Sequence, residues 1–67
     1  MTRMSTTQIH ADRVGDVLVS TVLIEPFGYY ETAIVRRSQP VELVESNIAD
    51  AGAAAELHRA TVEQLTP

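Results

Sequence analysis

Cysteine and lysine are both absent from this chain of 67 residues. Without cysteine the chain can form no disulfide, no thiolate nucleophile and no cysteine-ligated zinc or iron–sulfur site. Its three glycines, Gly15, Gly28 and Gly52, are isolated from one another, which excludes the glycine-rich loops that cradle nucleotide phosphates. We therefore expect no cofactor.

Basic side chains are few, since five arginines stand against nine acidic residues and the net charge is −4. This balance argues against binding to DNA or RNA, because phosphate binding normally needs a basic patch. No apolar run approaches the roughly 18 residues of a membrane span, and no apolar signal core stands near the N-terminus. We expect a soluble, cytoplasmic protein that contacts neither nucleic acid nor membrane.

The apolar pattern begins at Val14, and residues 1–13 before it are polar and rich in threonine. They carry too little apolar surface to offset the entropy lost on ordering, so we expect a mobile N-terminal tail. Addition of part of this tail to a sheet edge is the alternative. Residues 14–67 are expected to form one small domain.

Two strands joined by a tight turn are the clearest local feature. Residues 16–25 and 29–37 are rich in β-branched and aromatic side chains, and Pro26–Gly28 between them has the composition of a hairpin turn. Residues 41–45 alternate well enough for a short third strand. Because both faces of the first strand are largely apolar, we expect either that the strand is covered on both sides or that one face meets a second subunit.

An alanine-rich segment near the C-terminus predicts one amphipathic helix. Asn47 is the predicted N-cap, and Asp50 suits the first turn. Small and apolar side chains share one stripe, which comprises Ala51, Ala54, Ala55, His58, Val62 and Leu65. The predicted fold class is α+β, with a two- to three-stranded antiparallel sheet packed by one C-terminal helix.

Alanine buries little apolar area, so an alanine-lined helix stabilises a sheet less than a leucine-lined one. The second face of the sheet still carries large apolar groups, which predicts a homodimer rather than a monomer. A chain of this size also encloses little volume, so a sizeable ligand site is expected between subunits.

The hairpin and the helix together resemble a family of small uncharacterised proteins of actinobacteria and the bacteriophages that infect them. The matching segments are Ser20–Val22, Phe27–Gly28, Tyr30–Val35 and the alanine-rich stretch through Leu57–Arg59. The resemblance covers about residues 17–65, although the turn is shorter than the family's loop and an aromatic residue before the helix is missing. It implies the same order of elements and a phage or prophage-like origin, and therefore the host cytoplasm. The family has no assigned activity.

His58 is the titratable residue of the helix stripe, where a buried imidazole needs a partner. Glu31 or a backbone carbonyl is the predicted partner. A structural role is favoured over acid–base catalysis, because Ser20 and Thr21 inside a strand form no nucleophile elbow. His10 and His58 lack the spacing of a metal site. We therefore predict no catalytic residue and no metal.

Aromatic side chains flank the hairpin turn. Tyr29 and Tyr30 are expected to point to opposite faces, one into the core or an interface and one to the surface. Aromatic residues are enriched in interface cores, so a surface tyrosine beside Phe27 is a candidate anchor for a partner.

Two arginines, Arg36 and Arg37, end the second strand, and Arg13 is a candidate neighbour in space. They are expected to protect the sheet edge and to pair with Glu42 or Glu45, with an anion clamp as the alternative.

The candidate binding residues are Phe27, Tyr29, Tyr30, Glu31, Arg36, Arg37 and His58. Because no catalytic constellation is present, we expect a non-enzymatic protein that acts through protein–protein contacts, as a homodimer and on a host or phage protein. One alternative is a binder of nucleotide-type ligands, with Arg36, Arg37, Tyr29 and His58 lining a cleft between subunits. The others are an antitoxin-like β-β-β-α module, which would lack its proline-glycine signature here, and a minor enzyme built on His58 and Glu31.

Overall fold

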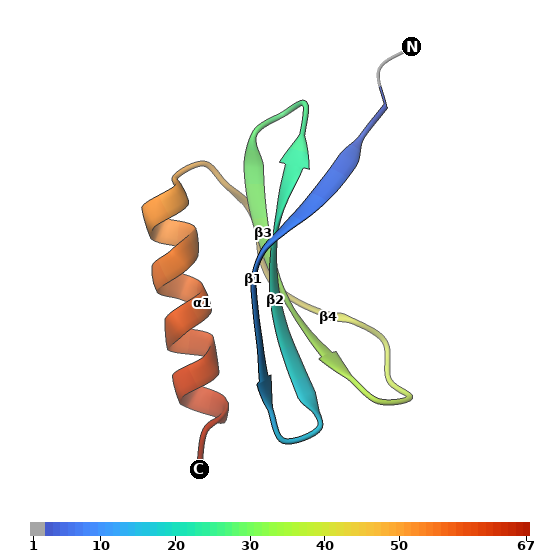
Figure 1. Cartoon of the computed structure of the whole chain (residues 1–67), viewed down its shortest axis with the longest axis vertical. Helices are drawn as coiled ribbons and strands as arrows, with labels where there is room; N and C mark the ends of the chain where they lie inside the picture. The colour runs from blue at the N-terminus through green and yellow to red at the C-terminus, as the bar shows by residue number, and fades with distance from the viewer. Residues whose placement is uncertain (1–2) are drawn as a thin grey trace.

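A computed structural model describes residues 3–67 as a four-stranded antiparallel sheet followed by one helix (Figure 1). The elements are β1 (Ser5–Val14), β2 (Val17–Glu25), β3 (Tyr29–Arg36), β4 (Glu42–Ile48) and α1 (Ala51–Leu65). Each strand pairs with its predecessor in sequence, so the spatial order is β1-β2-β3-β4. The α+β class is confirmed, but the sheet has four strands rather than two or three. Within residues 3–67, no helix is long and apolar enough to cross a membrane.

The first strand corrects the prediction of a mobile tail. Residues 5–13 belong to β1 and pair along β2, whereas residues 1–2 lie outside the described part of the chain. Gly15 and Asp16 form the connecting turn, and Gly15 adopts a φ of +61°, which two-residue hairpin turns require at their first position. An edge strand is held mainly by backbone hydrogen bonds and needs few apolar side chains. The polar sequence of β1 therefore did not indicate a strand.

The hairpin of β2 and β3 was predicted correctly. Pro26–Gly28 connects the strands, Gly28 has a φ of +76°, and its amide donates a hydrogen bond of 2.9 Å to the carbonyl of Ile24. The predicted third strand also exists, as β4, and extends to Ile48.

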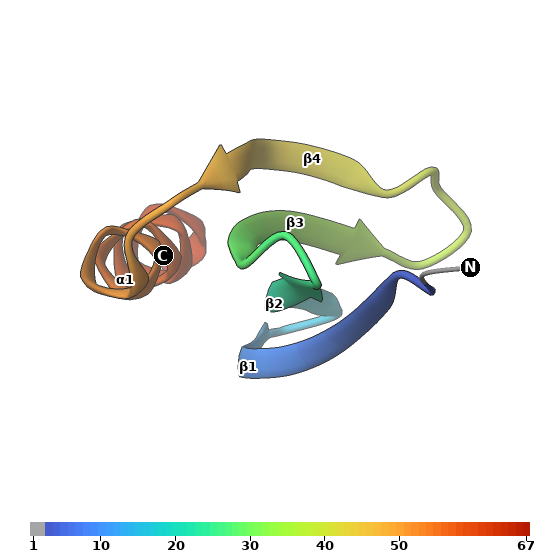
Figure 2. The same ribbon diagram turned by 90° about the horizontal axis from the view of Figure 1, so that it is seen from above.

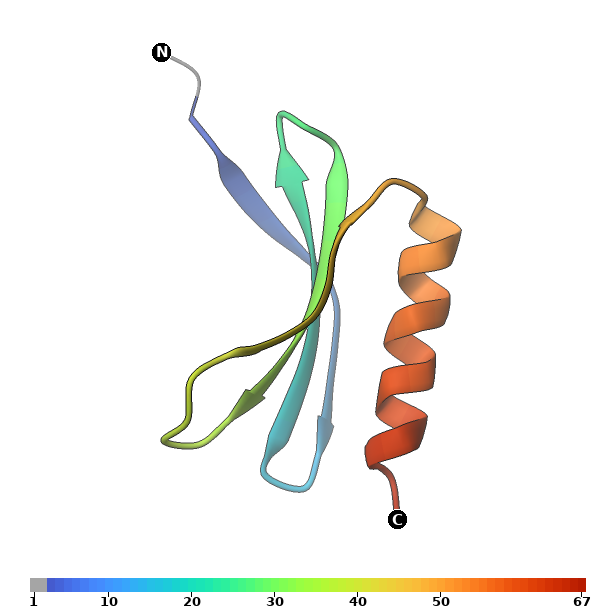
Figure 3. The same ribbon diagram turned by 180° about the vertical axis from the view of Figure 1, so that it is seen from behind.

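The helix covers one face of the sheet, and no second layer among residues 3–67 covers the other (Figure 2). We call this second surface the open face. Its side chains from β2 and β3 are Leu18, Ser20, Val22, Ile24, Tyr29, Glu31, Ala33 and Val35. The reverse view shows α1 running alongside the sheet for most of the sheet's length (Figure 3).

The core between α1 and the sheet is small, and half of its buried residues are polar. The buried apolar residues are Val19, Ile34, Ile48 and Ala54, and the buried polar ones are Thr21, Thr32, His58 and Thr61. The small side chain of Ala54 lets the helix approach the sheet closely. Ala51 and Ala55, predicted to lie in the contact stripe, are exposed because the buried stripe follows the narrower row of Ala54, His58 and Thr61.

The helix begins after Asp50, so the prediction of Asn47 as N-cap is wrong. The Asp50 backbone is extended, and its carboxylate accepts a hydrogen bond of 2.7 Å from the amide of Ala53. Asn47 has a φ of +58°, a left-handed conformation, whereas an N-cap residue is normally extended.

We expect Asp50→Ala to lower the free energy of unfolding by about 1 kcal/mol, because the first turn of α1 loses its cap. Asp50→Asn keeps an acceptor and should retain most of the stability. Asn47→Gly, which accepts a positive φ without strain, should change stability by less than about 0.5 kcal/mol. Urea denaturation followed by circular dichroism measures all three, and a loss at Asn47→Gly equal to that at Asp50→Ala would contradict the assignment.

Candidate functional site

Four hydrogen-bonded side chains cross the core from β3 to β1, and we call Thr32, Thr21, His58 and Asp12 the His58 network. The hydroxyl oxygens of Thr32 and Thr21 lie 2.7 Å apart, and Oγ1 of Thr21 lies 2.8 Å from Nδ1 of His58. Nε2 of His58 lies 2.8 Å from Oδ2 of Asp12. His58 is only 5% exposed, whereas Asp12 is at the surface.

Strand register brings this network together. Thr21 lies opposite Thr32 in the β2–β3 pair and opposite His10 in the β1–β2 pair. Asp12 follows His10 by two residues and therefore points to the same face of the sheet. The ring of His10 lies 5.3 Å from that of His58, centroid to centroid. An irregularity in β1 between Gln8 and His10 shifts the alternation, so that Gln8 bonds Ser20 on the open face.

The His58 network can satisfy a neutral imidazole at both nitrogens. In that form the carboxylate of Asp12 can only accept, so Nε2 carries the proton, Nδ1 accepts from the hydroxyl of Thr21, and Thr21 in turn accepts from Thr32. Within residues 3–67, no buried side-chain nitrogen or oxygen lacks a partner. The predicted partner Glu31 lies opposite Val22 on the open face, so the sheet separates it from His58.

Hydroxyl, imidazole and carboxylate follow one another here as they do in a hydrolase triad. The hydroxyl of Thr21 has no exposed surface, however, and is out of reach of a substrate. In the described part of the chain, no group of three or more histidine, aspartate or glutamate residues is placed to hold a metal ion. Through these contacts the network ties α1 to three strands.

Thr21, Thr32 and Asp12 were missed from the sequence. A signal for the threonines existed, because each stands between apolar neighbours on its own strand face, just as His58 stands in an apolar helix stripe. Polar groups on two apolar surfaces that pack together must satisfy one another. Asp12 has no comparable pattern around it, because residues 1–13 are mostly polar and were predicted to form a tail.

The open face is apolar at its centre. Leu18, Val22, Ile24, Ala33 and Val35 are half-buried there, shielded only by their neighbours in the same sheet. Leu43 of β4 lies opposite Ala33 and therefore shares this face, and it is 52% exposed. The expectation of a sheet that is apolar on both sides holds for this chain.

Aromatic residues lie at the β2–β3 turn. Phe27 in the turn and Tyr29 at the start of β3 are exposed, and Tyr29 belongs to the open face. Tyr30 is half-buried on the face toward α1, opposite Ile48. The prediction that the two tyrosines point to opposite faces is confirmed.

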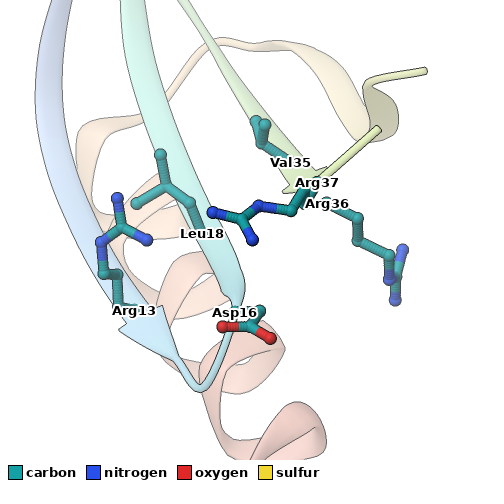
Figure 4. Close-up of a pocket in the computed structure, with 6 residues that line it drawn as sticks. All are labelled: Arg13, Asp16, Leu18, Val35, Arg36 and Arg37. Carbon is teal, nitrogen blue, oxygen red and sulfur yellow. The ribbon is translucent and has the colours of Figure 1, made fainter. Parts of the chain in front are cut away.

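The other end of the open face holds a cavity of about 300 Å³ (Figure 4). It is lined by Arg13, Asp16, Leu18, Val35, Arg36 and Arg37. Arg36 forms an ion pair of 2.6 Å with Glu42, one of its predicted partners, and Arg13 lies near both strand-end arginines as expected. Among residues 3–67, neither Arg13 nor Arg37 has a carboxylate within 4.0 Å.

Arg59 offers a contrast on the solvent side of α1. It lies 2.5 Å from a carboxylate oxygen of Glu56 and also pairs with Glu63. The hydrogen bond from Arg59, with its charge, lowers the pKa of Glu56 below the usual value. This arginine is therefore neutralised by its own helix, unlike Arg13 and Arg37.

The predicted binding residues do not form one site. Tyr29 begins β3 and Arg37 follows its other end, whereas His58 lies on the buried side of α1, across the sheet from the open face. Within one chain, Arg36, Arg37, Tyr29 and His58 line no common cleft. Comparisons of this chain with protein-family models, curated proteins and solved structures find no match. Functional inference therefore depends on its own geometry.

We expect Thr21→Val to lower the free energy of unfolding by about 1–3 kcal/mol, because Nδ1 of His58 and the hydroxyl of Thr32 both lose their partner. The matched control is Thr61→Val, since the hydroxyl of Thr61 bonds only a carbonyl within the helix and its loss leaves no side chain unpaired. Chemical denaturation compares the variants. Equal losses for the two, or a similar loss for Glu31→Gln, would show that the network has no special role.

Proposed function

We propose that this protein is a non-enzymatic interaction module whose open face binds protein, with a second copy of the chain as its partner. The observation that supports this most strongly is the two-layer fold of residues 3–67, in which no second layer covers the apolar open face (Figure 2). Among residues 3–67, only four apolar residues are buried, and small domains of this kind commonly gain stability by association.

The size of the open face supports a face-to-face dimer. The chain measures 43 × 27 × 15 Å along its principal axes, so its broad side is large relative to its thickness. Four strands about 4.8 Å apart and about eight residues long offer roughly 500 Å² in projection. Because side chains make the surface uneven, the accessible area of the open face exceeds its projected area. It therefore approaches the roughly 600–800 Å² that each partner buries in a specific interface.

The charge distribution supports the same surface. The open face and its cavity carry Arg13, Arg36, Arg37, Asp16 and Glu31. Because Arg36 is paired with Glu42, two charges of each sign remain, and the net charge of −4 belongs to the rest of the chain. Two copies of an acidic chain repel each other least where they are neutral.

The family resemblance adds two further parts to this proposal. They are an origin in an actinobacterium or one of its phages, and action on a host or phage protein in the host cytoplasm. The uncovered apolar face supports a role in protein contacts, and the burial of Thr21 and His58 supports a role without catalysis.

Light scattering tests the dimer directly, and we expect about twice the chain mass of 7.3 kDa. Leu43→Glu places a carboxylate in the proposed interface and should raise the dimer dissociation constant at least about 100-fold. Val41→Glu is the matched control, because Val41 is 62% exposed and precedes β4. It should leave the mass unchanged.

Circular dichroism shows whether each variant keeps its fold. A wild-type chain that stays monomeric at millimolar concentration would overturn the proposal. A folded Leu43→Glu variant that dimerises as well as Val41→Glu would overturn the choice of this face.

A further inference from the structure

We propose that the cavity at the β1–β2 turn binds a small organic monocarboxylate, with Arg13 and Arg37 holding the carboxylate. This inference goes beyond the proposed function, because the whole cavity is built from one chain and needs no second copy.

The cavity has a charged rim and an apolar floor. Leu18 lies opposite Arg13 on one side and opposite Val35 on the other, so the three side chains form one row across β1, β2 and β3. Arg37 follows the end of β3, and Asp16 lies in the turn (Figure 4). A ligand therefore meets guanidinium groups at its polar end and aliphatic side chains along its body.

Two of the three arginines are available to a ligand. Arg36 is held by Glu42 at 2.6 Å, whereas Arg13 and Arg37 have no carboxylate within 4.0 Å among residues 3–67. The chain has nine acidic and five basic residues, so its net charge is negative. Arg13 and Arg37 nevertheless form a local group of positive charge. A guanidinium group presents parallel N–H donors that match the two oxygens of a carboxylate.

The charge of the cavity selects a monoanion. The ion pair of Arg36 and Glu42 is neutral as a unit, and Asp16 offsets one of the two remaining arginines. The cavity therefore carries one net positive charge, which a single carboxylate neutralises, whereas a dianion such as phosphate would leave one negative charge uncompensated. The volume of about 300 Å³ and the aliphatic floor favour an anion with an apolar body over acetate.

Benzoate is the probe that tests this site, titrated into the full-length protein and followed by amide chemical shifts in NMR. We expect saturable shifts at residues 13–18 and 35–37, and binding at least tenfold weaker for benzamide, the neutral analogue of the probe. Arg13→Gln and Arg37→Gln should each weaken binding about tenfold or more. Arg59→Gln, an arginine on the solvent side of α1, should leave binding unchanged.

Asp16→Asn is expected to tighten benzoate binding, a result that an unfolded variant could not give. Asparagine suits the same turn position, and removal of the negative rim charge should tighten benzoate binding severalfold. The absence of saturable shifts with benzoate would overturn the proposal, as would equal effects of Arg59→Gln and Arg13→Gln. Tighter binding of inorganic phosphate than of benzoate would overturn the assignment to a monocarboxylate.

Discussion

A buried imidazole needs a hydrogen-bond partner at each nitrogen, and this requirement fixes how α1 sits on the sheet. His58 meets it through Thr21 on β2 and Asp12 on β1, and Thr21 in turn is bonded to Thr32 on β3. A shift of α1 along the sheet would leave at least one of these polar groups unpaired in the core, at a cost of about 1–3 kcal/mol for each. The polar network therefore specifies one position of the helix, which a stripe of small alanines would specify poorly.

The His58 network leaves little room for apolar side chains in the core. Because threonine and histidine occupy the centre of the core, the apolar contribution of the helix face is small. Much of the chain's large aliphatic surface lies instead on the open face, where Leu18, Val22, Ile24 and Val35 are only half-buried. The same surface is the neutral part of an otherwise acidic chain. Association and ligand binding are therefore both expected on the side that α1 leaves free.

The sequence predicted those features whose signal is local. The β2–β3 hairpin followed from Pro26–Gly28 between two β-branched runs, and the helix followed from its alanine content. β1 was predicted only as the alternative, in which part of the tail adds to a sheet edge, because a polar edge strand has no hydrophobic periodicity. Gly15 and Asp16 between two valines were a turn signal. The helix cap was misplaced by three residues, since Asn47 and Asp50 have equally suitable side chains and only the backbone conformation distinguishes them.

The partner of His58 was misassigned for a different reason. Glu31 was the one carboxylate on the predicted second strand, but a strand alternates its faces, and position 31 falls on the face away from α1. The residues that meet His58 depend on contacts between segments 37 and 46 positions apart. Such contacts are fixed by tertiary packing, which local sequence patterns do not encode.

The tautomer of His58 tests the central claim most directly. Long-range ¹H–¹⁵N correlation spectra, recorded at a pH where histidine is neutral, report which ring nitrogen carries the proton. The network predicts a single Nε2–H tautomer with Nδ1 as an acceptor, together with nuclear Overhauser contacts from the ring to the methyl group of Thr21. A proton on Nδ1, or an averaged signal like that of free histidine, would contradict it.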